Sequence, residues 1–265
     1  MTENERLRVV QFLRTKDDIT CERRESFPGG VATLSDGELS RVLHMNLLRV
    51  EVLPDRLSVR ELKEEAERLA EEAERLQKAL AFRRIVVYDE EIGTRLALGF
   101  EQLERWQTER VVLMAQHRAP DRSVDTGFVR EINQEELEPA RSRFLLARAG
   151  GDRERVRQEL IAARRLQAAG EVHCFGAFVE SDVVSFCELY SDSSGAATIR
   201  SVATLEEHRG GGLARAVVTH ALARSQALAH DLTFLRAVRD DWPKNLYGKL
   251  GFDAIGMVYR FTRSA

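Results

Sequence analysis

A strand pattern that passes through three consecutive glycines into a helix pattern constrains this chain more than any other feature. Residues 199–205 look like a strand, Arg209 and the glycines at 210–212 follow, and an apolar helical pattern begins at Leu213. Glycine has no Cβ atom, so this loop can adopt positive φ angles and let a ligand approach the backbone. The first N–H groups of a helix have no acceptor within it, and they lie at the positive end of the helix dipole. The segment therefore predicts a binding site for an anion such as a diphosphate, with Arg209 adding positive charge.

The glycine loop alone does not identify its ligand. No Lys-Ser or Lys-Thr pair follows the glycines, so the loop is not a Walker A motif, and its spacing differs from the dinucleotide-binding GxGxxG pattern. A lone glycine triplet is also typical of an ordinary flexible turn.

The second half of the chain alternates between strand and helix patterns. Strands separated by helices indicate a mixed α/β sheet. The predicted strands are residues 128–132, 172–179, 183–190, 199–205, 232–238 and 252–261, and the predicted helices are 139–149, 156–170, 213–228 and 243–250.

The first half carries a weak copy of the second at an offset of 152 residues. The order strand, turn, helix, strand, helix, Gly-Phe, strand recurs, and chance is the alternative because apolar residues are common. The matched pairs are Leu47 with Ile199, Val50 with Val202, Leu53 with Leu205, Phe82 with Phe234, Leu98 with Leu250, and Gly99-Phe100 with Gly251-Phe252. Within this copy, apolar residues recur at helical spacing over 59–80, which favours a helix packed on its own sheet over a coiled-coil seam for a partner.

Two motifs in the second half resemble the GNAT superfamily of N-acetyltransferases. The segment Arg209-Gly210-Gly211-Gly212-Leu213-Ala214 matches the signature Arg/Gln-x-x-Gly-x-Gly/Ala, and 247–252 matches a Tyr-x-x-x-Gly-Phe run. The resemblance covers about residues 127–262, and the degenerate first copy resembles tandem members of the family. It implies an α/β fold of two tandem GNAT-like domains, each a mixed, mainly antiparallel sheet flanked by helices. The expected domains are 1–118 without a cofactor motif, a linker at 119–126, and an acetyl-CoA-binding domain at 127–265.

The resemblance also implies a function and a site. The expected activity is transfer of an acetyl group from acetyl-CoA to a primary amine of a small acceptor, by direct attack. The alternative is a non-catalytic sensor or scaffold that binds coenzyme A or acyl-CoA. The residues expected to hold coenzyme A are Val202, Ala203, Thr204, Leu205, Arg209, Gly210, Gly211, Gly212, Leu213 and Ala214.

Tyr247 and Glu188 are the expected catalytic residues. Tyr247 matches the tyrosine that protonates the leaving thiolate in many family members, and the alternative is that its ring only packs against the pantetheine. Glu188 lies in a strand-like stretch and is the best candidate for the base that deprotonates the amine; the alternative is a solvated carboxylate or an ion pair.

This sequence departs from the family pattern at several positions. Glu206 replaces a frequent proline, and Asp241 replaces a frequent asparagine and could instead cap the helix that begins near residue 243. In the first copy, residues 57–60 replace the Arg-Gly motif and Arg95 replaces the tyrosine. We expect that half to bind no coenzyme A and to wall the acceptor cleft or cover a sheet edge.

Composition excludes several other classes of protein. The net charge is −3 and the pI is about 6.1, so nothing favours general nucleic-acid binding. The three cysteines, Cys21, Cys174 and Cys187, are widely spaced, which argues against a disulfide scaffold and a CxxC metal site. No apolar run approaches the roughly 18 residues of a membrane span, and no signal peptide is evident. We therefore expect no metal, a cytoplasmic location, and a monomer or homodimer.

Overall fold

The computed structural model describes residues 3–264, and these form two compact units that are each assembled from separate stretches of the chain. Unit 1 comprises the chain up to Phe12, Met114–Arg236 and Trp242–Ile255. Unit 2 comprises Leu13–Leu113, Ala237–Asp241 and the chain from Gly256 onward. The domain boundaries expected from the sequence remain a proposal, since these units divide the chain at other positions. None of the helices within residues 3–264 is both long and apolar enough to span a membrane.

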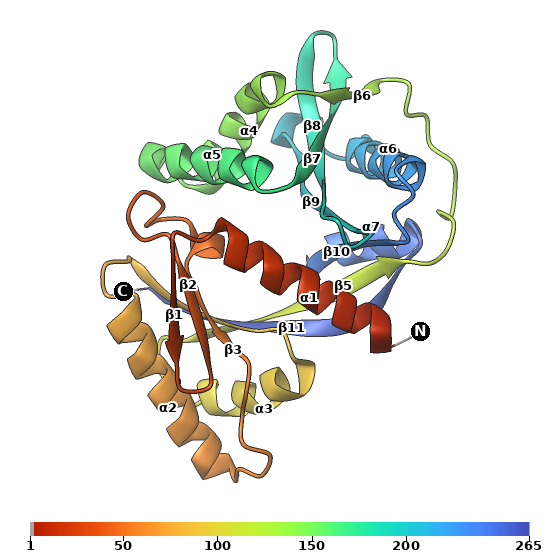
Figure 1. The fold of residues 1–265 in the computed structure, drawn as a ribbon. Coiled ribbons are helices and arrows are strands. Elements are labelled where there is room, and N and C mark those ends of the chain that lie inside the picture. Colours follow the sequence, from red (N-terminus) through yellow and green to blue (C-terminus); the bar gives the residue numbers. More distant parts are fainter. Residues whose placement is uncertain (1–2, 265) are drawn as a thin grey trace. The chain divides into compact units, whose positions relative to one another are not determined.

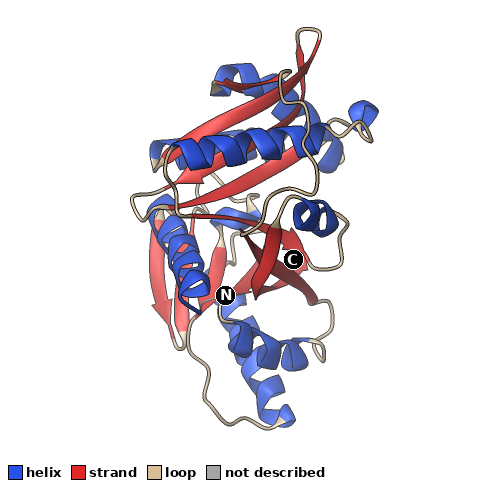
Figure 2. Cartoon of the chain, turned by 90° about the vertical axis from the view of Figure 1, so that its right-hand side faces the viewer, coloured by secondary structure: helices blue, strands red, loops and turns tan. Residues whose placement is uncertain are grey.

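The sheet of unit 1 lies between two layers of helices (Figures 1 and 2). Helices α4 and α5 cover one face and α6 the other. The pairings are antiparallel except for β10 with β9, which is parallel. The strand order is β10-β9-β8-β7-β6. These elements are β6 (Val129–Ile132), α4 (Gln134–Arg148), α5 (Arg153–Ala168), β7 (Glu171–Val179), β8 (Asp182–Ser191), β9 (Ala196–Thr204), a 3-10 turn (Glu206–His208), α6 (Leu213–Ala227), β10 (Leu232–Val238) and α7 (Pro243–Lys249).

Alternate residues of β8 face opposite helix layers. Phe186 packs with Leu137 of α4 in one hydrophobic cluster, whereas the Cys187 thiol donates a hydrogen bond to the Val217 carbonyl of α6 at 3.3 Å. The continuous apolar character of β8 therefore follows from burial on both faces.

Helix α4 begins earlier than the sequence prediction. We expected a helix over 139–149 with Pro139 in its first turn, but α4 starts at Gln134 and contains Pro139 in its interior. Asn133 accepts a hydrogen bond from the Glu136 backbone, and the Glu136 side chain accepts one from the Asn133 backbone. This capping box fixes the helix start upstream of the proline.

Unit 2 repeats the same motif around its own core. The strand–helix–strand–helix–strand order β3-α2-β4-α3-β5 matches β9-α6-β10-α7-β11, which confirms the internal repeat predicted from the sequence. Its strand order is β1-β2-β3-β4-β11-β5. The elements not yet defined are α1 (Glu3–Thr20), β1 (Arg23–Phe27), β2 (Gly30–Leu34), a 3-10 turn (Leu43–Met45), β3 (Leu47–Val50), α2 (Val59–Leu76), β4 (Phe82–Val87), α3 (Glu90–Phe100), β5 (Gln107–Gln116) and β11 (Phe252–Ser264).

The apolar stripe of α2 is buried within unit 2. It joins the cluster built on β2, β3, β4 and α3, so the helix packs on its own sheet as we predicted. The buried stripe residues are Leu62, Ala66, Leu69, Ala73 and Leu76.

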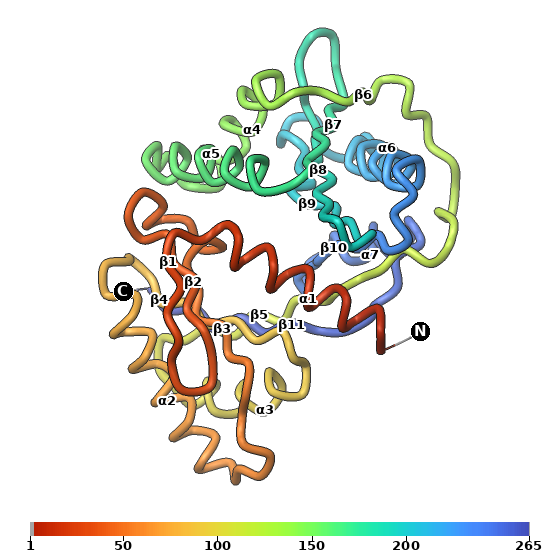
Figure 3. The backbone as a smooth tube through the Cα atoms, in the orientation of Figure 1, coloured from red at the N-terminus to blue at the C-terminus, as the bar shows by residue number. Residues whose placement is uncertain are grey.

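The last strand of the chain completes the sheet of unit 2. From Tyr259 to Ser264, β11 pairs with β4 in antiparallel register, and Tyr259 and Phe261 are buried in the core of unit 2. Figure 3 allows this path to be followed along the chain. The second copy of the repeat thus supplies a strand to the unit built mainly from the first.

Candidate functional site

The glycine loop takes the left-handed conformation that its sequence predicts. Gly210 has φ 85° and Gly212, the N-cap of α6, has φ 80°, a region that residues with side chains rarely adopt. A Cβ atom built on Gly210, Gly211 or Gly212 would meet no heavy atom within 4 Å. The loop is therefore open on the side where a ligand would approach.

The N–H groups that follow this loop have no acceptor among the described residues. The first bond within α6 is donated by the Ala216 N–H to the Gly212 carbonyl at 3.1 Å, and the N–H groups from Gly210 to Ala214 donate none. No side chain caps α6, and its first turn carries no acidic residue. By contrast, side chains cap α2, α3, α4 and α5. The start of α6 thus combines free donors with the positive end of a dipole, which suits an anion.

Arg209 lies at the rim of the loop. Its side chain is 57% exposed, and its Nε donates to the Thr204 carbonyl at 3.4 Å. Glu206 is only a distant partner, with 4.0 Å between the charged atoms. The guanidinium is therefore tethered near the end of β9 while most of it remains accessible.

Strand β9 separates from β10 before it reaches the loop. The two strands pair only from Ala196–Leu232 to Thr198–Phe234, although β9 continues to Thr204. An irregularity in the β8–β9 register coincides with Ser201, which has φ 54°. Such a bulge bends a strand and increases its local twist.

The separated part of β9 has one edge that β10 does not pair, where the Thr204 carbonyl accepts from the Arg209 side chain at 3.4 Å. The Leu205 N–H donates to the Val184 carbonyl on β8, and the Ala203 carbonyl accepts from the Ser185 hydroxyl. Because backbone groups alternate sides along a strand, those of Val202 and Thr204 point away from β8, toward the opened side. An extended ligand could therefore pair with this edge as an added strand.

Glu188 is a buried carboxylate held by two arginines. Its side chain is 2% exposed, Arg141 donates to Oε1 at 2.6 Å, and the Arg200 Nε lies 3.4 Å from Oε2. Burial pushes the pKa of Glu188 up, but Arg141, Arg200 and a hydrogen bond with Ser201 outweigh it, so the pKa is lowered. The carboxylate therefore stays ionised at neutral pH and ties β8 and the β9 bulge to α4.

Tyr247 is buried on α7, and the centre of its ring lies 6.2 Å from the centre of the Phe252 ring in an edge-to-face arrangement.

Helix α7 starts at Pro243, as the sequence predicted. Its N-cap is Trp242, whose side chain makes no capping hydrogen bond. Asp241, suggested from the sequence as the cap, lies one residue further upstream. The N-cap position therefore belongs to Trp242 and not to Asp241.

The segment after β5 is tied to the Tyr-x-x-x-Gly-Phe motif. Gly251 has φ 89°, and a Cβ atom there would lie 1.8 Å from the Arg118 carbonyl, so only glycine fits. The Asp121 N–H donates to the Lys249 carbonyl, and its carboxylate accepts from Arg215 at 2.6 Å. This connection links the end of α7 to the first turn of α6.

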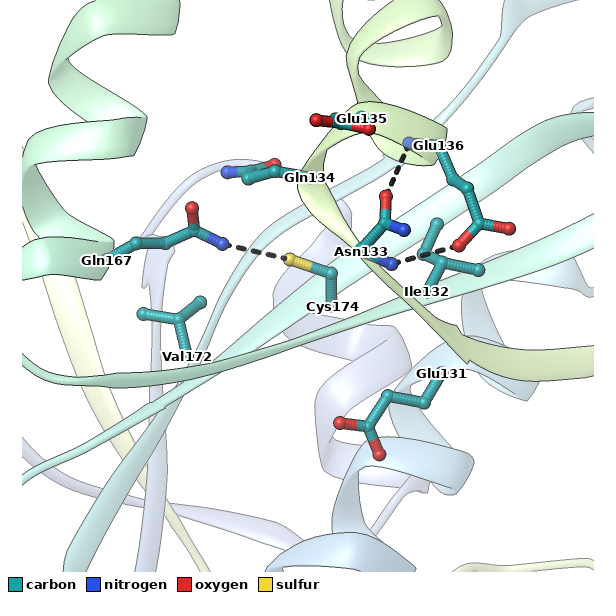
Figure 4. A pocket seen from close by; sticks show the side chains of 9 residues that line it. All are labelled: Glu131, Ile132, Asn133, Gln134, Glu135, Glu136, Gln167, Val172 and Cys174. Atoms are coloured by element: carbon teal, nitrogen blue, oxygen red, sulfur yellow. Dashed lines mark hydrogen bonds between the residues drawn. The ribbon is translucent and has the colours of Figure 1, made fainter.

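A larger cavity, of about 650 Å³, lies beside β6 and the start of α4 (Figure 4). Cys174 and Val172 of β7 are among its lining residues. Across β8, the strand register aligns these two residues with Arg200 and Thr198 of β9. Both positions precede Val202, the first residue expected to bind the cofactor, so this cavity does not coincide with the predicted cofactor site. Burial raises the pKa of the Cys174 thiol to about 12, so this thiol is unreactive. Within residues 3–264, no group of three or more potential ligands could hold a metal ion.

A smaller cavity was not anticipated from the sequence. It has a volume of about 240 Å³ and lies where α4 ends and α5 begins. Charged residues occur all along both helices, so no spacing singled out its lining. The lining residues are Phe144, Leu145, Arg148, Ala149, Arg155, Val156 and Glu159.

With this geometry established, comparison with known proteins identifies the domain. The family model described as Acetyltransferase (GNAT) family matches residues 128–252. These residues form a GNAT-family domain. The match contains the glycine loop, the separated part of β9 and the Tyr-x-x-x-Gly-Phe motif, which confirms the resemblance noted in the sequence.

Solved structures extend the likeness in fold to nearly the whole chain. A GCN5-related N-acetyltransferase from Kribbella flavida is 14% identical with a TM-score of 0.64, covering 97% of this chain and 95% of that one. A functionally unknown conserved protein from Staphylococcus epidermidis is 13% identical with a TM-score of 0.62, covering 93% and 95%. A tandem GNAT protein from the clavulanic acid biosynthesis pathway is 17% identical with a TM-score of 0.53, covering 89% and 78%.

These likenesses confirm the predicted fold class, an α/β fold shared with tandem GNAT proteins. A search of curated proteins gave no match to this chain. The family match is therefore a statement about residues 128–252, and the activity and the acceptor have to be argued from the site.

Proposed function

We propose that this protein transfers an acetyl group from acetyl-CoA to a primary amine of a small acceptor, by direct attack of the amine on the thioester. The observation that carries the proposal is the row of N–H groups from Gly210 to Ala214, which have no acceptor within residues 3–264 and lie at an uncapped helix N-terminus. An anionic diphosphate would satisfy these donors, and the space beside the glycines is open.

The same site offers partners for the rest of the donor molecule. Bound acetyl-CoA would supply an acetyl group activated as a thioester. Arg209 and the loop would hold its diphosphate, and the backbone of Val202 and the Thr204 N–H, on the edge that β10 does not pair, would bind its pantetheine arm. A backbone N–H aimed at the developing oxyanion there would be worth about 3 kcal/mol.

Tyr247 would donate its proton to the leaving thiolate. A phenol keeps its proton at neutral pH, because its usual pKa is about 10. Its place in the matched motif supports this role, and the alternative is that the ring simply packs against the pantetheine.

For Glu188, the contacts favour the ion pair over the free base. Both carboxylate oxygens face arginines, and the lowered pKa makes the group a weak base. We propose that Glu188 positions the β9 bulge, and its role as base stays a prediction. Glu188→Gln distinguishes the two: loss of a base removes the acidic limb of the kcat/KM profile, whereas loss of positioning lowers kcat and leaves the shape unchanged.

In this proposal unit 2 binds no coenzyme A and has a structural role. We place the reaction in the cytoplasm, without a metal, a nucleic acid or a membrane, in a monomer or homodimer. The second candidate function is a sensor that binds acyl-CoA without turnover. Buried Tyr247 would then be a packing residue only.

The test measures release of free thiol from acetyl-CoA with a panel of amines, for the wild type and Tyr247→Phe. We expect turnover with at least one amine and a drop in kcat of about 10²-fold or more for the variant, at unchanged acetyl-CoA affinity. Binding of acetyl-CoA without turnover by any amine would favour the sensor, and absence of binding would overturn both functions.

A further inference from the structure

The small cavity between α4 and α5 carries a surplus of positive charge. Arg148 and Arg155 both line it, and neither guanidinium has a carboxylate within hydrogen-bond or ion-pair distance among the described residues. The only other charged residue of the lining is Glu159. Two guanidiniums against one carboxylate leave a net charge of +1.

The rest of the lining is apolar. Phe144, Leu145 and Val156 contribute aromatic and aliphatic surface, and the Arg148 guanidinium lies 5.7 Å from the centre of the Phe144 ring. A volume of about 240 Å³ is slightly below the roughly 300 Å³ at which drug-sized sites begin. The cavity therefore fits a small molecule that combines an apolar group with an anionic one.

One residue of the cavity lining, Phe144, contacts the strand that pairs with the separated part of β9. The Phe144 ring meets Phe186 edge-to-face at 6.0 Å, and Phe186 pairs with Ala203 in the β8–β9 ladder. On the same helix, Arg143 donates to Glu207 at 2.5 Å, in the turn that leads to the glycine loop. The end of α4 is thus fixed to both the separated strand and the loop.

Glu159 lies in the same charged surroundings. Burial raises its pKa, and nearby Arg155, Arg200 and Arg148 only partly offset this. Glu159 is therefore the acidic group in this lining that the two arginines face.

We infer that this cavity binds the anionic group of the acceptor, so that the substrates are small amines that also carry a carboxylate, such as apolar amino acids. Arg148 and Arg155 would contact the carboxylate, and Phe144 and Val156 would contact the apolar side chain. Guanidinium–carboxylate contacts are favoured because the planar fork can form two parallel hydrogen bonds. This inference rests on the proposed function for its catalytic readout only.

The kinetic test compares matched amines. The first comparison is between phenylalanine and phenethylamine, which lacks only the carboxylate. The second comparison, between phosphoethanolamine and ethanolamine, tests whether a phosphate can serve as the anionic group. For phenylalanine we expect KM to rise about tenfold or more in Arg148→Gln and Arg155→Gln, with a much smaller rise for phenethylamine. Arg153→Gln, an exposed neighbour on α5 outside the lining, is the matched control and should leave KM unchanged.

A binding measurement separates this inference from the proposed function. Calorimetry with 3-phenylpropanoate, which has the carboxylate and ring but no amine to acetylate, should show binding to the wild type and about tenfold weaker binding to either variant. If no amine turns over but 3-phenylpropanoate binds in this arginine-dependent way, the proposed function fails and the anion site stands. Equal use of phenylalanine and phenethylamine, a preference for phosphoethanolamine alone, or binding insensitive to both arginines would overturn the carboxylate assignment.

Discussion

The two strand–loop–helix junctions of the repeat, β3–α2 in unit 2 and β9–α6 in unit 1, have the same element order and opposite chemistry. At α2, Ser58 accepts from the Glu61 N–H, and the Glu61 carboxylate accepts from the Ser58 N–H at 2.7 Å. These two hydrogen bonds form a capping box at α2. At α6 the N-cap is Gly212, and no side chain forms a capping hydrogen bond there. One helix start satisfies its own donors, and the other leaves them for a ligand.

The strands that lead into these helices differ in the same way. In unit 2, β3 and β4 stay paired to the final residue of each, Val50 with Val87. In unit 1, pairing stops at Thr198 and Phe234 while β9 runs on to Thr204. The comparison teaches that, among the described residues, the two junctions differ in whether their backbone hydrogen-bonding groups are satisfied, and the proposed binding site lies where they are not.

The largest expected effect comes from removing the strand that unit 2 takes from the C-terminus. A chain ending at Ile255 loses the pairing with β4 and the buried rings of Tyr259 and Phe261. Losing even one buried aromatic ring costs about 3–5 kcal/mol, against a total stability of about 5–15 kcal/mol for a domain. We expect unit 2 to unfold, measured as loss of hydrogen-exchange protection in β4.

The control for this truncation removes only the last two residues and should preserve that protection. A truncated chain in which β4 stays protected would show that unit 2 does not depend on β11.

The next effect concerns the buried ion pair between Glu188 and Arg141 at the β9 bulge of unit 1. Glu188→Gln leaves Arg141 buried without its counter-charge, which we expect to cost about 3–5 kcal/mol in urea unfolding at pH 7. Glu64→Gln, which breaks an exposed pair with Arg60 on α2, should cost at most about 1 kcal/mol.

The pH dependence of this cost follows from the lowered pKa of Glu188. Stability from the pair is present above the unfolded pKa of about 4.3 and is lost as pH falls through the lower folded pKa. The difference between wild type and Glu188→Gln should therefore shrink with acidification below that point. A constant difference across this range would contradict the ion-pair assignment.

A negative charge introduced next to the free amides should weaken ligand binding without unfolding the loop. Gly211 does not have a positive φ, and a side chain there would enter open space. We expect Gly211→Asp to lower coenzyme A affinity by about 10–100-fold, equivalent to about 1.4–2.8 kcal/mol, through repulsion of the diphosphate.

Gly211→Asn, which has nearly the same shape and no charge, is the matched control for this change and should have a much smaller effect in the same calorimetric titration. Wild-type affinity in the Asp variant would mean that the diphosphate binds elsewhere.

The smallest effect is expected at the corresponding junction of unit 2. Ser58→Ala removes the N-cap of α2 and should lower stability by about 1 kcal/mol, measured by denaturant unfolding. Coenzyme A affinity should stay at the wild-type value. A change in that affinity would show that the β3–α2 junction takes part in binding.

Much of unit 1 was predictable because its local signals are strong. The ends of β10, at Leu232 and Val238, match the prediction, and the glycine loop and α6 lie where the sequence indicated. The start of α4 was missed because Pro139 was taken as a first-turn residue, and the Asn133–Glu136 capping box upstream of it was not recognised.

The remaining features depend on contacts between segments far apart in sequence. Nothing in the alternation of Tyr259 and Phe261 specifies which sheet they join, so the pairing of β11 with β4 could not be read from local pattern. The arginines around Glu188 come from α4 and β9, and only the fold brings them together.

The chain order of β11 has a consequence for biosynthesis. Domains usually fold in the order in which they leave the ribosome. Here, most of unit 2 is translated first, but Tyr259 and Phe261, which belong to its core, follow only after most of unit 1. The earlier-made strand β4 therefore lacks its β11 partner until residues 259–264 have been synthesised.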